Sequence, residues 1–118
     1  MLAADGGAII NVSSVFADRG GPSAEYSSTK HAIRGLTRTT AIDYASRGIR
    51  VNELQQGVID TEMTQANLEG TQAVADRGIP LKRVGAAREV ATAIAFLLSD
   101  DASYITGAHL AVDGGFLA

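Results

Sequence analysis

The order of a short apolar strand, a long helix and a second strand most constrains how this chain can fold. Residues 8–12 form an apolar run rich in β-branched side chains, between a glycine pair and a serine pair. Such a run predicts a strand buried on both faces, as in parallel sheets. Residues 25–47 contain no proline and one glycine, which predicts a long helix, and residues 48–54 return to strand-like alternation. This order predicts a right-handed crossover between parallel strands and therefore an α/β fold.

The remaining periodicity predicts how the other elements pack. Spacings of three and four on the long helix predict one apolar stripe against the sheet, made of Ile33, Leu36, Thr40, Ala41 and Tyr44. A second amphipathic helix is predicted over residues 87–98 and a last short strand over residues 109–112. Residues 60–85 show no clean period, and we interpret them as a mobile excursion with one or two short helices that covers a substrate.

Charge and residue usage exclude several classes of function. The 10 basic and 13 acidic residues are spread along the chain, so we expect neither nucleic acid nor an anionic membrane as a partner. With no cysteine, the chain has no thiol nucleophile and no thiolate metal site, and we expect no metal. The longest apolar run, residues 93–98, is far short of the roughly 20 residues that cross a bilayer. We therefore expect a soluble cytoplasmic protein.

Tyr26 and Lys30 are the side chains best placed to carry chemistry. They lie four positions apart at the start of the long helix, so both project from one face. A nearby cation favours the ionised form of a phenol, which suits the pair to proton transfer. The same spacing also fits a half-buried tyrosine followed by a solvated lysine. The pair follows a strand that ends in Ser13 and Ser14, and this context favours chemistry because open α/β sheets bind ligands at the carboxyl ends of strands.

Several motifs in one order resemble the short-chain dehydrogenase/reductase family. Residues 7–14 are similar to the family strand that ends in a catalytic serine, and Tyr26 and Lys30 match its Tyr-x-x-x-Lys signature. Segments similar to the following strand, a cofactor-contacting loop and the closing segment are residues 47–52, 57–61 and 105–115. The resemblance implies a partial Rossmann-like, doubly wound parallel sheet. Residues 1–118 would be the C-terminal part of one domain, truncated at the N-terminus within a helix whose tail is residues 1–6, and without the dinucleotide-binding βαβ unit.

The resemblance also implies an activity, the NAD(P)-dependent interconversion of a carbonyl and a secondary alcohol. Tyr26 would give a proton to the carbonyl oxygen or remove it from the alcohol. Lys30 would favour the ionised phenol and hydrogen-bond the nicotinamide ribose, and Ser14 would orient the substrate oxygen. The residues implied to bind the cofactor, NAD or NADP, are Tyr26, Lys30, Gly57, Ile59 and Thr61. The complete protein is expected to form homo-oligomers.

Alternatives to this assignment remain open at three points. Ser13 would match the family's frequent spacing to Tyr26, and we prefer Ser14 because loops absorb deletions more readily than strand ends. Gln56 stands where the family usually has proline before Gly57, so the turn loses a fixed φ angle. The alternative function is a truncated, non-catalytic interaction module. The outer edge of the first strand is expected to lack a partner and to invite association, and we expect the chain alone to bind the cofactor weakly or not at all.

Overall fold

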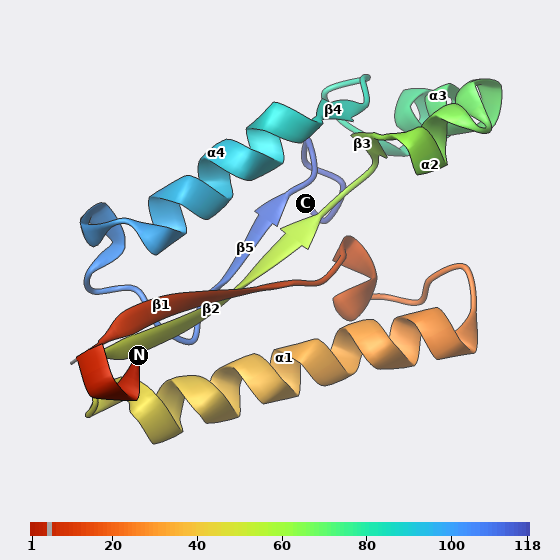
Figure 1. Ribbon diagram of the computed structural model, residues 1–118. Coiled ribbons are helices and arrows are strands. Elements are labelled where there is room, and N and C mark those ends of the chain that lie inside the picture. Colours follow the sequence, from red (N-terminus) through yellow and green to blue (C-terminus); the bar gives the residue numbers. More distant parts are fainter. Residues whose placement is uncertain (5) are drawn as a thin grey trace.

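A parallel sheet of three strands lies between two helices in the computed structural model, which describes residues 1–4 and 6–118 (Figure 1). The strands, in the spatial order β1-β2-β5, are Gly7–Val12, Ile49–Gln56 and His109–Val112. Helix α1 (Ala24–Ala45) covers one face of the sheet and helix α4 (Ala87–Leu98) covers the other. The predicted α/β class, both long helices and all three strands are confirmed.

Smaller elements connect this framework. Residues 60–85 contain two short helices, as predicted, and the two ends of this segment pair in parallel, Ile59 with Gly85 and Asp60 with Ala86. The smaller elements are the 3-10 turns η1 (Leu2–Ala4), η2 (Val15–Ala17) and η3 (Asp100–Ala102), the strands β3 (Ile59–Asp60) and β4 (Gly85–Ala86), and the helices α2 (Glu62–Gln65) and α3 (Leu68–Gly78). The helix tail expected over residues 1–6 corresponds to η1, and Asp5 lies outside the described residues. No helix in the described part of the chain is long and apolar enough to cross a membrane.

Side chains of β1 and β2 alternate between the two helices because successive residues of a strand point to opposite faces. Odd-numbered residues face α1, where Ile49 and Val51 pack with Ala41 in one small core. Even-numbered residues face α4. There a larger core contains Leu54, Ile59 and Val90, and the apolar side chains packed against it are Ile10, Ala93, Ile94 and Val112.

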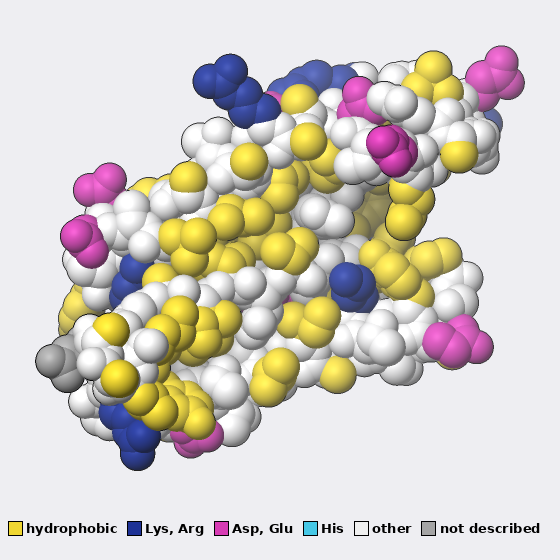
Figure 2. Space-filling view, in the orientation of Figure 1, with side chains coloured by type: hydrophobic (Ala, Val, Ile, Leu, Met, Phe, Trp, Pro, Cys, Tyr) yellow, Lys and Arg dark blue, Asp and Glu magenta, His cyan; other side chains and the backbone are white. Residues whose placement is uncertain are grey.

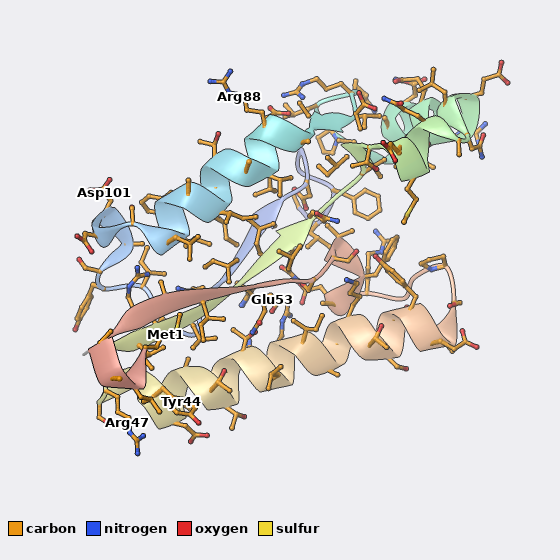
Figure 3. All side chains as sticks on the ribbon, viewed as in Figure 1. Met1, Tyr44, Arg47, Glu53, Arg88 and Asp101 are labelled. Atoms are coloured by element: carbon orange, nitrogen blue, oxygen red, sulfur yellow. The ribbon has the colours of Figure 1, made fainter. Side chains whose placement is uncertain are left out.

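The apolar stripe predicted for the long helix is wrong in part. Ala41 is buried, but the side chains of Leu36 and Tyr44 are exposed, and Figure 3 shows Tyr44 near the C-terminal end of α1. The reason lies in the sheet beneath α1, whose odd-numbered face carries polar side chains toward its carboxyl end: Asn11, Ser13, Glu53 and Gln55. Buried polar groups need hydrogen-bond partners, so α1 turns Thr37 toward Asn11, whose Nδ2 donates to Thr37 Oγ1 at 2.9 Å.

Strand β1 was expected to be buried on both faces, and this expectation is also wrong. Ile9 and Val12 are 37% and 40% exposed. The reason is that β1 is an edge strand, which pairs only with β2 among the described residues, as the expected free outer edge requires. Hydrophobic side chains gather on the surface between β1 and α4 (Figure 2).

Strand β2 is the most deeply buried element, and its C-terminal end lies two residues beyond the predicted one. Its side chains from Val51 to Gln55 are all buried, although three of them are polar: Asn52, Glu53 and Gln55. Pairing extends to its last residue, Gln56, opposite Val112.

Leu54→Ala should lower the free energy of unfolding more than a substitution at an exposed position does. Leu54 is fully buried in the core under α4, and removing a buried leucine side chain costs about 2–5 kcal/mol of unfolding free energy. The matched control is Ile42→Ala on the solvent side of α1, where Ile42 is 79% exposed and the change should stay within about 0.5 kcal/mol. Urea denaturation followed by circular dichroism measures both, and equal losses would contradict the assigned core.

Candidate active site

The turn after β1 holds two serines at the carboxyl end of the sheet. Ser13 continues the strand ladder, since its backbone N–H donates to the Leu54 carbonyl at 2.8 Å. Ser14 is buried and caps η2, because its Oγ accepts a hydrogen bond from the Phe16 N–H at 3.3 Å. The first turn of α1 lies at this same end of the sheet (Figure 1). This is the edge where open α/β sheets bind ligands.

Tyr26 and Lys30 meet at the start of α1, as their spacing predicts. Ser23 caps the helix by accepting a hydrogen bond from the Tyr26 N–H at 3.3 Å. Lys30 Nζ lies 5.5 Å from the centroid of the Tyr26 ring, within the range of a cation–π contact. Tyr26 is 39% exposed. The phenol therefore combines a neighbouring cation with access from outside.

An aromatic contact with Phe16 packs Tyr26 against the serine turn. The rings of Phe16 and Tyr26 pack edge to face, with centroids 6.2 Å apart and an interplanar angle of 75°. Phe16 in turn packs edge to face on Phe116, in the segment after β5, at 6.3 Å. Phe16 is two residues after Ser14, so this packing relates the serine turn to the phenol. Sequence reasoning missed both phenylalanines, because nothing in their spacing distinguishes them from ordinary core residues.

The residues expected to bind a cofactor follow β2 at the same end of the sheet. Gly57 passes close to Asp113, whose Cα would lie only 2.8 Å from a Cβ at position 57. Ile59 buries its side chain in the core under α4, and its carbonyl accepts a hydrogen bond from Thr64 Oγ1 at 2.7 Å. Thr61 is exposed at the start of α2 and donates its N–H to Thr64 Oγ1 at 2.8 Å.

A cleft of ≈ 530 Å³ lies beside these residues, between the β3–β4 bridge and the turn after β5. Its lining comprises Val58, Ile59, Pro80, Leu81, Arg83, Gly85, Glu89, Ala111, Val112, Asp113, Gly114 and Gly115. Ser14, Tyr26 and Lys30 are outside this lining. The predicted site residues thus form two groups, one around η2 and α1 and one after β2.

A buried polar network, absent from the sequence-based expectations, lies under the serine turn. Ser13 Oγ donates to one oxygen of the Glu53 carboxylate, and Arg34 Nε donates to the other at 3.2 Å. Arg34 Nη1 also donates to Asp18, and Gln55 Nε2 donates to the second Asp18 oxygen at 3.0 Å. Glu53 is 1% exposed and lies between β2 and α1 (Figure 3). We call this network the polar anchor: Ser13, Asp18, Arg34, Glu53 and Gln55.

A charged residue inside a strand with buried neighbours on both sides was the only available signal for this network. Glu53 stands between Asn52 and Leu54 in such a strand, and a buried carboxylate needs a cation or several hydrogen-bond donors. The residue that supplies the cation, Arg34, is 19 positions away in the sequence. The fold, rather than the spacing, reveals this pairing.

Comparison with known proteins decides the family of the chain. Residues 1–117 match a family model described as enoyl-(acyl carrier protein) reductase. The chain belongs to the short-chain dehydrogenase/reductase family. The predicted resemblance is thereby confirmed, while the roles of the individual site residues remain predictions.

Relatives in this family include enzymes with different substrates. The chain is 44% identical to cis-4-hydroxycyclohexanecarboxylate dehydrogenase of Sinomonas cyclohexanicum, over 100% of this chain and 48% of that protein. It is 43% identical to 3-oxoacyl-acyl-carrier-protein reductase FabG of Chlamydia trachomatis serovar D, over 98% of this chain and 47% of that protein. The chain therefore spans about half the length of the curated relatives it matches.

A solved structure of this family has the same arrangement of elements. L-sorbose reductase from Gluconobacter frateurii, in complex with NADPH and L-sorbose, superposes with a TM-score of 0.90. The sequences are 35% identical, and the match covers 99% of this chain and 49% of the reductase. The Rossmann-like character of this partial α/β domain is thereby confirmed.

The charges of the polar anchor make the stability of the fold depend on pH in the acid range. The Arg34 guanidinium, by hydrogen bonding to Asp18, lowers the pKa of that carboxyl from 3.8 to about 2. Hydrogen bonding to the same carboxylate raises the pKa of Arg34. A carboxyl whose pKa is lower in the folded than in the unfolded chain stabilises the fold above the unfolded pKa, and this contribution is lost as the pH falls through the folded pKa.

Stability should therefore decline as the pH falls from about 4 toward about 2, and Asp18→Asn should reduce the slope of this decline. The variant keeps an oxygen that accepts a hydrogen bond but cannot ionise. Urea denaturation of both proteins across this interval, at constant ionic strength, measures the difference. A carbon-detected NMR titration of the Asp18 carboxyl tests the cause directly, and a midpoint near the ordinary 3.8 would contradict it.

Proposed function

We propose that this chain carries the catalytic residues of an NAD(P)-dependent oxidoreductase that interconverts a carbonyl and a secondary alcohol. The observation that supports this most directly is the position of Lys30 Nζ, 5.5 Å from the Tyr26 ring centroid, at the carboxyl end of a parallel sheet. Membership of the short-chain dehydrogenase/reductase family also supports it. Because the chain spans about half the length of its curated relatives, the proposal concerns the chemistry of the site that these residues form.

Tyr26 acts as the general acid in reduction and as the general base in oxidation. During reduction its hydroxyl gives a proton to the substrate oxygen as the carbonyl carbon gains a hydride, and the reverse steps form the carbonyl. Lys30 stabilises the phenolate that remains, because a cation beside a phenol favours its ionised form. Among the described residues, Lys30 Nζ donates no hydrogen bond and joins no ion pair. Its ammonium group is thus available to a ribose hydroxyl.

Ser14 orients the substrate oxygen toward Tyr26. Its Oγ already accepts a hydrogen bond from the Phe16 N–H. A hydroxyl has one donor as well as its acceptor capacity, so the Ser14 O–H can point at the carbonyl oxygen. Ser13 is less suited to this role, since its hydroxyl donates to Glu53 within the polar anchor. This contact favours Ser14 over Ser13 for a reason that the spacing to Tyr26 alone did not provide.

The chain's residues fit the nicotinamide end of NAD or NADP. Gly57 allows the segment after β2 to pass close to Asp113, where any side chain would collide. This segment leads to the backbone of Ile59 and to the exposed Thr61, which would contact the carboxamide and phosphate sides of the cofactor. The nicotinamide ring, when bound, supplies or accepts the hydride.

The substrate is proposed to be a small molecule without strong charge. The segment after Thr61 carries exposed apolar side chains, with Met63 86% and Leu68 65% exposed. Such side chains can cover an uncharged substrate next to the phenol. The exposed Leu36 and Ile42 on α1 support a homo-oligomer of the complete enzyme.

A second candidate function is a non-catalytic interaction module. It is favoured by the exposed apolar edge of β1, where Ile9 and Val12 are each more than a third exposed, and by the same residues of α1. This candidate predicts that removing the Tyr26 hydroxyl has no functional consequence. Substitution of that tyrosine therefore separates the two.

Tyr26→Phe, in the complete protein, should lower turnover by about 10²- to 10⁴-fold, which is the usual contribution of a positioned proton donor. The ring remains to pack on Phe16, so folding and cofactor affinity should stay within a few fold of the parent. The assay follows NADH and NADPH absorbance with a panel of small ketones and secondary alcohols. The matched control is Tyr104→Phe, because Tyr104 is fully exposed. Equal turnover by the Tyr26 variant and the parent would refute the proposal.

A further inference from the structure

The segment from Ser13 to Asp18 is held at both of its ends by the polar anchor. At its start, Ser13 Oγ donates to Glu53 on β2. At its end, Asp18 accepts hydrogen bonds from Arg34 on α1 and from Gln55 on β2. Between these two points lie Ser14 and Phe16, which are the residues that relate the serine turn to Tyr26.

The polar anchor is buried, and buried charged groups are an inefficient source of folding stability. Glu53 is 1% and Gln55 0% exposed, and taking charges out of water costs free energy that an ion pair rarely returns in full. Two buried atoms, Arg34 Nη2 and Gln55 Oε1, have no hydrogen-bond partner among the described residues. Apolar side chains of similar size would fill this space at lower cost. Stability alone therefore does not account for the charged residues in this space.

We propose that Glu53 and Arg34 are positioning residues, which hold the Ser13–Asp18 segment so that Ser14 and Tyr26 reach the same substrate oxygen. Arg34 links the two carboxylates, one at each end of the segment, through its Nε and Nη1 atoms. Because Arg34 and Tyr26 belong to the same helix, the anchor ties the serine turn to the element that carries the phenol. The expected effect on turnover rests on the proposed function. That Glu53 and Arg34 hold the Ser13–Asp18 segment in place does not depend on it.

The test compares variants that distinguish a displaced Ser13–Asp18 segment from a loss of folding stability. Glu53→Leu leaves the Arg34 charge without this partner and should destabilise the protein strongly. The double variant Arg34→Leu/Glu53→Leu removes both charges and should regain much of that stability. Its kcat should nevertheless remain about 10- to 100-fold below the parent, because small displacements of reacting groups carry penalties of this size, with KM for the cofactor nearly unchanged. Glu53→Gln, which keeps the acceptor for Ser13, should fall between the double variant and the parent.

Asn52→Leu supplies the matched control. Asn52 is as deeply buried as Glu53 on the same strand. Its side chain bonds instead to the backbone of Ile105 and Ala108, away from the serine turn. This variant should lose stability but keep kcat per folded molecule. Parent-like kcat in the double variant, or an equal loss in Asn52→Leu, would overturn the positioning role.

Hydrogen exchange provides a readout that does not need turnover. The amides of Ala17 and Asp18 donate to Ser14 and Val15 within the segment, and in the double variant they should lose protection while the β2 ladder keeps it. Retained protection would overturn the proposal whatever the enzyme does. If the double variant loses this protection but the parent turns over no carbonyl or alcohol, the anchor is upheld and the proposed function is refuted. Failure of the anchor and failure of the proposed function can therefore be distinguished.

Discussion

The buried carboxylate of Glu53 determines which face of α1 packs on the sheet. A carboxyl group at 1% exposure requires hydrogen-bond donors, and Arg34 and Ser13 provide them. Once Arg34 points at the sheet, helix geometry places Thr37 and Ala41 on the same side, three and seven residues later. Leu36 is consequently turned outward. One charged residue in a strand thus sets the orientation of the longest helix.

That orientation also positions the candidate active site. The same face of α1 that meets Glu53 continues toward the first helical turn, where Tyr26 packs on Phe16. Phe16 belongs to the turn that begins with Ser14. A core of ordinary apolar residues on the α4 side, centred on Leu54, supports the sheet from behind. The hydroxyl groups proposed to act on the substrate therefore lie on a packed base, and the segment of α2 and α3 lies beyond the strand ends (Figure 1).

The sequence predicted the elements and the family well because those features depend on local periodicity and on ordered motifs. The strands, both long helices and the contact between Tyr26 and Lys30 are confirmed. It could not predict the buried face of α1, because apolar spacing favoured Leu36 while the deciding partner, Glu53, lies on another element. For the same reason the polar anchor was missed. Burial of β1 on both faces was overestimated, since residue type does not reveal whether a strand has one neighbour or two.

Ser14 and Tyr26 are proposed to act on one substrate oxygen at the carboxyl end of the sheet. A crystal structure of the protein with a nicotinamide cofactor and an unreactive carbonyl analogue tests this proposal. We predict the analogue's oxygen within hydrogen-bond reach, about 2.6–3.2 Å, of both Ser14 Oγ and Tyr26 Oη. An analogue seated instead in the cleft beside Pro80 and Gly115, with its oxygen out of reach of the phenol, would contradict it.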